Sequence, residues 1–186
     1  MFAALFLGIQ LLGQSQADMI LCEGDFPNAT EVMSSLNRTY LLQSLQNISK
    51  LECAYQEYYY KKVSRDGLKH LRDAVYVYQE GSRRPQNNPL YIWEVVNYTI
   101  YLGSRSDFYK RHSELDILYS DSGSCMVIKN RDTKNFPKAC NLWVTDDSFL
   151  SPPTQCVNGF RRHCGSNLTT YGIGDCVGRH DYKNFE

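Results

Sequence analysis

The chain has 186 residues, of which 20 are Lys or Arg and 20 are Asp or Glu, so its formal net charge is zero. This balance gives no electrostatic basis for binding nucleic acid or an anionic membrane surface. The length suits one domain with a substantial core.

The first residues have the features of a targeting segment. The apolar run of residues 2–12 is too short to cross a bilayer as a helix. Ser15 and Ala17 then supply the small residues at the spacing that signal peptidase requires. We therefore expect residues 1–17 to be a signal peptide. Residues 18–186 are expected to form a single secreted, extracellular domain with no membrane insertion.

The chain from residue 18 to residue 48 has mixed or helical periodicity. Val32, Leu36 and Tyr40 recur at a spacing of four residues, as on one face of a helix. The segment 26–28, Phe-Pro-Asn, indicates a turn before them. We expect a short helix that leads into a first strand.

From residue 50 the pattern becomes that of strands. The aromatic-rich residues 51–60 and residues 71–78 predict two strands, and Asp66-Gly67 between them suits a tight hairpin turn. A loop is expected over residues 80–89, which contain glycine and prolines, and a long strand over residues 90–102.

The second half of the chain continues this alternation. Residues 108–119 are expected to hold two short strands or a hairpin arm, and residues 125–129 and 139–145 predict two strong strands. Ser-Pro-Pro at residues 151–153 begins a helix. Strands at a spacing of about ten residues suggest an antiparallel barrel or a sandwich.

Five Asn-x-Ser/Thr sequences mark surface glycosylation sites in a secreted chain. They lie at Asn28, Asn37, Asn47, Asn97 and Asn167. If Asn97 carries a glycan, strand alternation places Trp93, Val95 and Thr99 outside with it. The residues expected to face inward are then Ile92, Glu94, Val96, Tyr98, Ile100 and Leu102. The alternative is that this sequon is unused and the two faces are exchanged.

The chain lacks the motifs of common enzymes. It has no Gly-x-Ser-x-Gly, no phosphate-binding glycine loop and no His-Glu-x-x-His, and its four histidines are scattered. His163 beside Cys164 could suggest a thiol–imidazole pair, but an extracellular cysteine is more often bridged. We therefore expect no enzyme: no catalytic residue, no metal site and no cofactor.

The seven cysteines are expected to form disulfides in an extracellular chain. Five of them lie between Cys125 and Cys176, without the close Cys-x-x-Cys pairs of a zinc site. Their order around a strand and a helix suggests a clasp that holds the C-terminus, with Cys53 as the obvious distant partner. The odd number leaves one thiol unpaired or bridged between chains.

The content of 14 Tyr, 8 Phe and 2 Trp would suit a ligand cavity inside an eight-stranded barrel. Aromatic residues that fill a solid core, or tyrosines on an outer binding face, explain the composition equally well. Composition therefore leaves the two alternatives open.

Three segments in order resemble the tick salivary lipocalins, the histamine-binding-protein family: residues 124–129 (SCMVIK), 140–144 (CNLWV) and 155–160 (QCVNGF). A final Cys176 and an early Cys53 within Glu-Cys-Ala-Tyr fit the same family. The resemblance implies an all-β fold with flanking helices. It would be an eight-stranded antiparallel lipocalin barrel with a short N-terminal helix and a C-terminal helix packed outside.

The same resemblance implies the disulfide pairs Cys53–Cys176 and Cys125–Cys156, with Cys140–Cys164 as the expected third pair. Some relatives bridge an N-terminal cysteine to the closing helix region, so Cys22–Cys164 and Cys22–Cys140 remain alternatives.

The family implies sequestration of host mediators, including histamine, serotonin, leukotrienes, sterols or complement protein. Amine-binding relatives carry acids where this chain has Met126 and Asn141, and a buried cation needs a carboxylate partner. We therefore expect an apolar ligand, a sterol or a fatty-acid-like lipid, with Glu94 as the counter-evidence. The expected ligand-binding residues are Glu94, Val96, Tyr98, Ile100, Met126, Ile128, Asn141 and Trp143.

The expected function is binding of this apolar small molecule, with modulation or evasion of host immune and inflammatory responses. Scavenging of a biogenic amine such as histamine or serotonin is one alternative. A protein–protein inhibitor that acts through its surface without a ligand is another, and its partner would be a host immune-cell or plasma protein.

Overall fold

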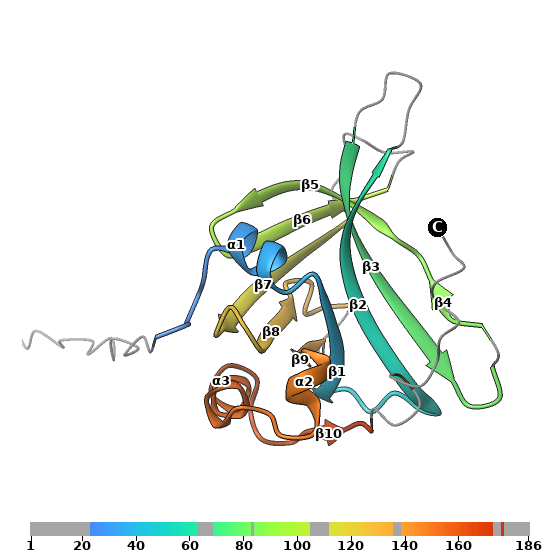
Figure 1. The fold of residues 1–186 in the computed structure, drawn as a ribbon, viewed down its shortest axis with the longest axis vertical. Helices are drawn as coiled ribbons and strands as arrows, with labels where there is room; N and C mark the ends of the chain where they lie inside the picture. The colour runs from blue at the N-terminus through green and yellow to red at the C-terminus, as the bar shows by residue number, and fades with distance from the viewer. Residues whose placement is uncertain are drawn as a thin grey trace, which may run out of the picture.

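The computed structural model describes residues 23–62, 69–82, 84–104, 112–135, 139–172 and 176. Within these residues, eight strands form a closed antiparallel barrel, because the last of them, β9, also pairs with the first, β1 (Figure 1). The barrel strands are β1 (Arg38–Ser44), β2 (Leu51–Lys62), β3 (Lys69–Gln79), β5 (Leu90–Val96), β6 (Thr99–Gly103), β7 (Ser113–Ser120), β8 (Cys125–Asn130) and β9 (Cys140–Val144). The predicted lipocalin barrel is therefore confirmed, and the sandwich is excluded.

Short elements complete the described part of the chain. The two-residue strands β4 (Gln86–Asn87) and β10 (Thr169–Thr170) pair with β3 and β1. Helix α1 (Ala29–Ser35) precedes β1, and α2 (Asp146–Phe149) and α3 (Thr154–Cys164) follow β9. The expected N-terminal and C-terminal helices are thus both present. None of the described helices is long and apolar enough to cross a membrane.

Some predictions fall on residues outside the described ranges. These are the signal peptide of residues 1–17, the Asp66-Gly67 turn and the N-terminal Cys22. Residues 108–119 were expected to hold two short strands or a hairpin arm, and the described part of this stretch belongs to one strand, β7.

Strand alternation separates the apolar side chains into two clusters. On β9, Cys140, Leu142 and Val144 face outward toward α3, whereas Trp143 faces the barrel interior. We call the interior group the inner cluster, and its fully packed members are Ala29, Val32, Met33, Leu36, Leu41, Ala54, Tyr58, Ile100, Leu102, Ile117, Met126, Ile128 and Trp143.

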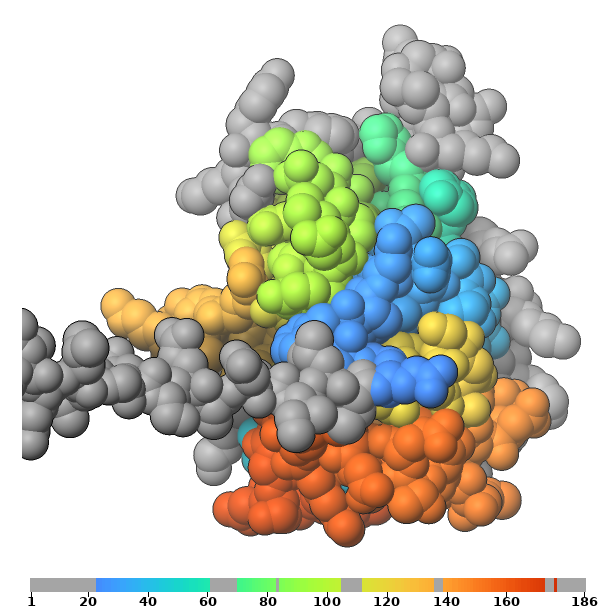
Figure 2. Space-filling view, turned by 90° about the vertical axis from the view of Figure 1, so that its left-hand side faces the viewer, coloured from blue at the N-terminus to red at the C-terminus, as the bar shows by residue number. Residues whose placement is uncertain are grey.

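Helix α1 packs on the inner cluster beside the β5–β6 turn. Its N-cap, Asn28, accepts two backbone N–H bonds of the first helical turn through its side chain. The Ala29 N–H donates to the Asn97 carbonyl oxygen (2.8 Å), which fixes the helix to that turn. Figure 2 shows this N-terminal segment (blue) between the β5–β6 hairpin (light green) and the C-terminal helix region (orange).

A carboxylate holds the N-terminal segment to α3. The Asp25 side chain is almost fully buried, and its Oδ1 lies 2.9 Å from Arg162 Nη2 and 2.8 Å from His163 Nε2. The Phe26 ring packs against the His163 ring with centroids 5.3 Å apart. The N-terminal segment and α3, far apart in the sequence, therefore stabilise each other.

The strand predicted over residues 90–102 is interrupted, which corrects the sequence prediction. Strands β5 and β6 meet at a two-residue turn, Asn97 and Tyr98, in which Asn97 has a φ of 54°. Asparagine tolerates this left-handed conformation better than most residues. Without a glycine beside it, however, the turn gives only a weak signal in the sequence.

The inward and outward faces of this hairpin agree with expectation at several positions. Ile100 and Leu102 are buried in the inner cluster, and Ile92 packs against it. Trp93 is exposed, as expected. Thr99 was placed outside, and its hydroxyl donates to Asp116 (2.7 Å) on the outer face of β7.

Four other positions correct the expected faces. A bulge between Ile92 and Glu94 shifts the register of β5 against β6. Glu94 and Val96 consequently lie exposed on the outside, whereas Val95 packs against the inner cluster. Tyr98, predicted to face inward, instead packs its ring against Phe26, with ring centroids 5.0 Å apart.

The three predicted disulfides are confirmed. The pairs are Cys53–Cys176, Cys125–Cys156 and Cys140–Cys164, with Cα atoms 5.4, 6.1 and 5.9 Å apart. The third pair excludes the alternative bridges from Cys22 to Cys140 or Cys164. Two of these bridges join α3 to β8 and β9, so the helix is covalently attached to the outer face of the barrel.

Gly159 allows α3 to lie directly on β7. A Cβ added at this position would stand 2.6 Å from Cγ of the buried Tyr119 ring. Although alanine favours a helix over glycine by about 1 kcal/mol, we expect Gly159→Ala to lower the free energy of unfolding by about 1–3 kcal/mol through overpacking. Urea denaturation measures this change. Gly172→Ala is the control, because an added Cβ there meets nothing within 4 Å; equal losses in both variants would contradict the packing argument.

Candidate ligand site inside the barrel

Three polar side chains lie together inside the apolar barrel. Gln56 and Tyr58 face inward from β2, and Asp73 on β3 is the direct cross-strand partner of Tyr58. Gln56 Nε2 donates to Asp73 Oδ1 (2.8 Å) and to the Tyr58 hydroxyl oxygen (3.0 Å). Their exposed fractions are 2%, 5% and 5%. We call these three residues the β2–β3 polar cluster.

The alternation of β3 places Asp73 in this position. Leu71, Val75 and Val77 share its face of the strand and pack against the inner cluster. Tyr76 lies on the opposite face and stacks on a tyrosine of β2. An aspartate thus interrupts an otherwise apolar inward row, and this interruption was the signal in the sequence that the prediction of lining residues missed.

Burial sets the charge state of the polar cluster. Removal from water raises the pKa of the Asp73 carboxyl from 3.8 to about 6, and the hydrogen bond from Gln56 limits the rise. At pH 7 this carboxyl is therefore mostly ionised. Burial, and then the nearby Asp73 charge, raise the pKa of Tyr58 well above its usual value, so the phenol stays neutral. The barrel interior consequently contains a desolvated negative charge.

Two buried oxygen atoms of inward-facing side chains lack hydrogen-bond partners among the described residues: Thr39 Oγ1 on β1 and Gln56 Oε1 on β2. Thr39 on β1 is the cross-strand partner of Gln56 and is fully buried. It shares the inward face of β1 with Leu41 of the inner cluster. Because buried polar atoms are normally paired, these two oxygens are exceptions within the described part of the barrel.

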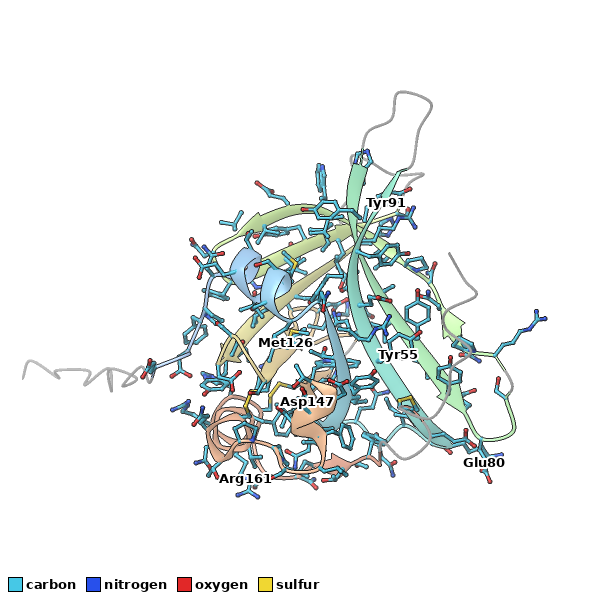
Figure 3. The ribbon with its side chains drawn as sticks, in the orientation of Figure 1. Tyr55, Glu80, Tyr91, Met126, Asp147 and Arg161 are labelled. Carbon is cyan, nitrogen blue, oxygen red and sulfur yellow. A yellow bond between two sulfur atoms is a disulfide. The ribbon has the colours of Figure 1, made fainter. Side chains whose placement is uncertain are left out.

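The remaining inner surface is apolar and partly aromatic. Met126 and Trp143 are cross-strand partners on β8 and β9, and Leu41 lies opposite Trp143 on β1. All three are buried, and Met126 is labelled among the barrel side chains in Figure 3. An indole ring and a flexible thioether suit the irregular apolar body of a small molecule.

The predicted lining residues divide into two groups. Four belong to the inner cluster, namely Ile100, Met126, Ile128 and Trp143. Asn141 is half-buried and is the cross-strand partner of Ile128, so it faces the same interior. Glu94, Val96 and Tyr98 lie elsewhere, for the reasons given above. The sequence prediction also omitted Thr39, Gln56 and Asp73, the polar part of the interior.

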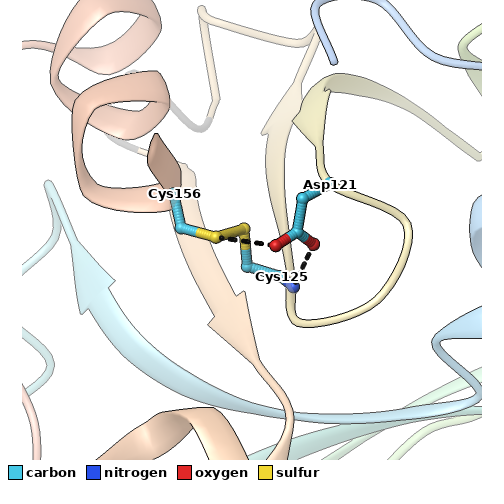
Figure 4. A group of neighbouring side chains, drawn as sticks. All are labelled: Asp121, Cys125 and Cys156. Carbon is cyan, nitrogen blue, oxygen red and sulfur yellow. Dashed lines mark hydrogen bonds between the residues drawn. A yellow bond between two sulfur atoms is a disulfide. The ribbon is translucent and has the colours of Figure 1, made fainter. Parts of the chain in front are cut away.

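A second group of side chains has the composition of a metal site but not its chemistry (Figure 4). Potential ligand atoms of Asp121, Cys125 and Cys156 lie within 4.8 Å of one another. Both sulfur atoms belong to one disulfide, so neither can supply the thiolate that binds a metal. Asp121 Oδ1 instead accepts the backbone N–H groups of Gly123, Ser124 and Cys125, at 3.1, 2.7 and 3.0 Å. This group therefore stabilises the β7–β8 turn.

Comparison with known proteins agrees with the barrel fold. The model of the family "Tick histamine binding protein" matches residues 27–177. No curated protein matches the sequence. Among solved structures, the cockroach major allergen Per a 4 has a TM-score of 0.54 and 11% identity, covering 86% of this chain and 97% of that chain. The siderocalin Ex-FABP has a TM-score of 0.48 and 11% identity, covering 73% of this chain and 91% of that chain.

At 11% identity, the allergen structure supports the fold and nothing finer. The family model, in contrast, spans most of the chain and includes the six paired cysteines. The protein belongs to the tick histamine-binding family of lipocalins.

Proposed function

We propose that this lipocalin binds a small cationic amine inside its barrel, as reversible sequestration without catalysis or a cofactor. The observation that carries the proposal is the buried carboxylate of Asp73 in a mostly apolar interior. A buried charge without a counter-charge is unfavourable by several kcal/mol, on the order of the penalty for desolvating one ion. A protonated amine supplies the missing charge, and its apolar or aromatic body would lie against the inner cluster.

The family description names histamine, an amine, which agrees with this class of ligand. This chain lacks the acids that amine-binding relatives carry at the positions of Met126 and Asn141. Asp73 provides a carboxylate from β3, a different part of the barrel wall. Trp143 and Tyr58 add aromatic surface for the body of the ligand and for the cation itself.

An apolar ligand, a sterol or a fatty-acid-like lipid, is the second candidate because most of the inner cluster is hydrocarbon. Burying such a ligand contributes about 25 cal/mol per Å² of apolar surface. A sterol hydroxyl could donate to Gln56 Oε1, but it would leave the Asp73 charge unpaired, and a fatty-acid carboxylate would be repelled by it. A sterol ligand would make the chain similar to Japanin, the cholesterol-binding immunomodulator of the same family.

Calorimetric titration with serotonin and with cholesterol, from about pH 5 to about pH 8, separates the two candidates. The serotonin ammonium stays protonated throughout this range because aliphatic amines have a pKa near 10. Asp73 must be ionised to pair with it, so we expect tight serotonin binding at pH 8. The affinity should fall by about tenfold per pH unit below about pH 6, the pKa of Asp73.

Cholesterol carries no titratable group, and its affinity should not fall with acidification. Tight cholesterol binding that is constant or stronger at pH 5, with no measurable serotonin binding, would contradict the amine proposal and favour the apolar ligand. Serotonin affinity without pH dependence would show that a group other than Asp73 pairs with the amine.

We further propose that the protein is secreted and glycosylated, and that removal of a host mediator modulates host immune or inflammatory responses. The disulfides support an oxidising compartment. All five sequon asparagines are exposed. At Asn28 the helix cap uses Oδ1, which leaves the Nδ2 atom accessible to a glycan. A host immune-cell or plasma protein would be a second partner, at the outer surface.

A further inference from the structure

Thr39 Oγ1, Gln56 Oε1 and the Asp73 carboxylate are three acceptors, the same number as the N–H donors on a primary ammonium group. We propose that Thr39 and Gln56 make the barrel selective for primary amines and exclude their N-methylated forms. This inference rests on the proposed function and specifies the chemical class of its ligand. It follows from two buried oxygens without partners among the described residues, on the inward faces of β1 and β2, and from a buried carboxylate on the inward face of β3.

The orientation of the Gln56 amide is fixed by its own hydrogen bonds. Nε2 has two hydrogens, and it donates to both Asp73 Oδ1 and the Tyr58 hydroxyl oxygen. Exchanging the amide oxygen and nitrogen would place the amide oxygen against the Asp73 carboxylate, which has no proton to donate at pH 8, and would lose that bond. Gln56 therefore presents Oε1, an acceptor, to the rest of the interior.

Thr39 supplies the next acceptor from the adjacent strand. It is the cross-strand partner of Gln56, so their Cβ atoms are about 5 Å apart on the same inward face. The Asp73 carboxylate lies on the other side of Gln56, on β3. Three neighbouring strands thus present a hydroxyl oxygen, an amide oxygen and a carboxylate to one region of the interior. In this proposal, each of the three N–H groups of R–NH₃⁺ donates to one of them.

Methylation of the amine removes these donors one at a time. A tertiary ammonium keeps a single N–H, which the Asp73 carboxylate would take, and a quaternary ammonium keeps none. Thr39 Oγ1 and Gln56 Oε1 would then stay buried without partners while the charge on the ligand is unchanged. A site built around hydrogen bonds discriminates strongly against an analogue that cannot make them.

The experiment titrates serotonin, its N,N-dimethyl form and its N,N,N-trimethyl form into three proteins at pH 8. The proteins are the wild type, Thr39→Val, and the matched control Thr99→Val, whose hydroxyl lies on the outer face of the barrel. In the wild type we expect affinity to fall by about tenfold or more from serotonin to the dimethyl form, and again from the dimethyl to the trimethyl form, as N–H donors are lost. Thr39→Val should lower the affinity for serotonin by about tenfold and leave the affinity for the trimethyl form unchanged. The preference for serotonin over the trimethyl form is then smaller than in the wild type. Thr99→Val should leave all three affinities unchanged.

Each result bears on a distinct claim. Equal wild-type affinity for the three amines, or the same preference in Thr39→Val as in the wild type, overturns the selectivity while amine binding stands. Failure of the wild type to bind any of the three amines overturns the proposed function and this inference with it. The wild-type series needs no variant, so the test is decisive even if Thr39→Val does not fold.

Discussion

Asp73→Asn is expected to weaken serotonin binding by at least about 100-fold at pH 8, because one partner of a buried ion pair is removed. The substitution changes the charge and little else. The side-chain oxygen of the introduced asparagine could still accept the hydrogen bond that Gln56 Nε2 now donates to Asp73. Calorimetry measures the loss, and the pH dependence near pH 6 should disappear with it.

The same variant is expected to be more stable than the wild type when no ligand is present. An acid whose pKa is raised in the folded state favours folding less as pH rises from its unfolded pKa to its folded pKa. For Asp73 this window runs from 3.8 to about 6. The variant should therefore match the wild type near pH 4 and exceed it by up to about 3 kcal/mol at pH 7.

Urea denaturation at both pH values tests the second effect. A variant that gains stability while losing its ligand cannot be explained by misfolding. The quantity compared is the unfolding free energy of the variant minus that of the wild type. If this difference is lower at pH 7 than at pH 4, the ionised carboxylate stabilises the empty barrel. That outcome would falsify the argument that Asp73 lacks a counter-charge.

Removing the Cys125–Cys156 disulfide with paired alanines is expected to cost about 3–4 kcal/mol of unfolding free energy, from the entropy of a loop of 31 residues. Both cysteines are fully buried, so small cavities add to the loss. For a chain of this size the melting temperature should drop by about 10 °C. Differential scanning calorimetry under non-reducing conditions measures the shift.

Ligand affinity provides the contrast for this second variant. The disulfide joins α3 to the outer face of β8, whereas the polar cluster lies on the inner faces of β2 and β3. Well below its melting temperature, the variant lacking the bridge should bind serotonin within about threefold of the wild type, because distant sites act independently. A drop of 100-fold would mean that α3 controls the shape of the interior, contrary to the proposed separation.

The elements and the cysteine pairing could be predicted because each has a short-range signal. Residues 51–60 and 71–78 are rich in aromatic and β-branched side chains, and the observed strands β2 and β3 extend them by only a few residues. The disulfides followed from the family resemblance of the C-terminal segments. The turn at Asn97 could not be predicted in this way, since asparagine without glycine is an ambiguous turn signal.

The site was harder to predict, because which residues face the interior depends on the register of every strand around the barrel. One bulge after Ile92 was enough to move Glu94, the carboxylate singled out in the sequence, to the outside. The carboxylate that does lie inside, Asp73, occurs in a strand whose inward row is visible only once its pairing with Tyr58 is known. The unpaired oxygens of Thr39 and Gln56 have no sequence signal, since their state depends on three strands at once.

Alternation along β9 has a consequence for how such a protein can diversify. Cys140, Leu142 and Val144 hold the C-terminal helix and its bridges, while Asn141 and Trp143 between them face the barrel interior. Exchanges on the inward face of this strand can therefore change the chemistry of the interior while the alternate residues keep the helix and its bridges in place. One strand thus separates the residues that determine what the barrel could hold from those that attach its outer helix.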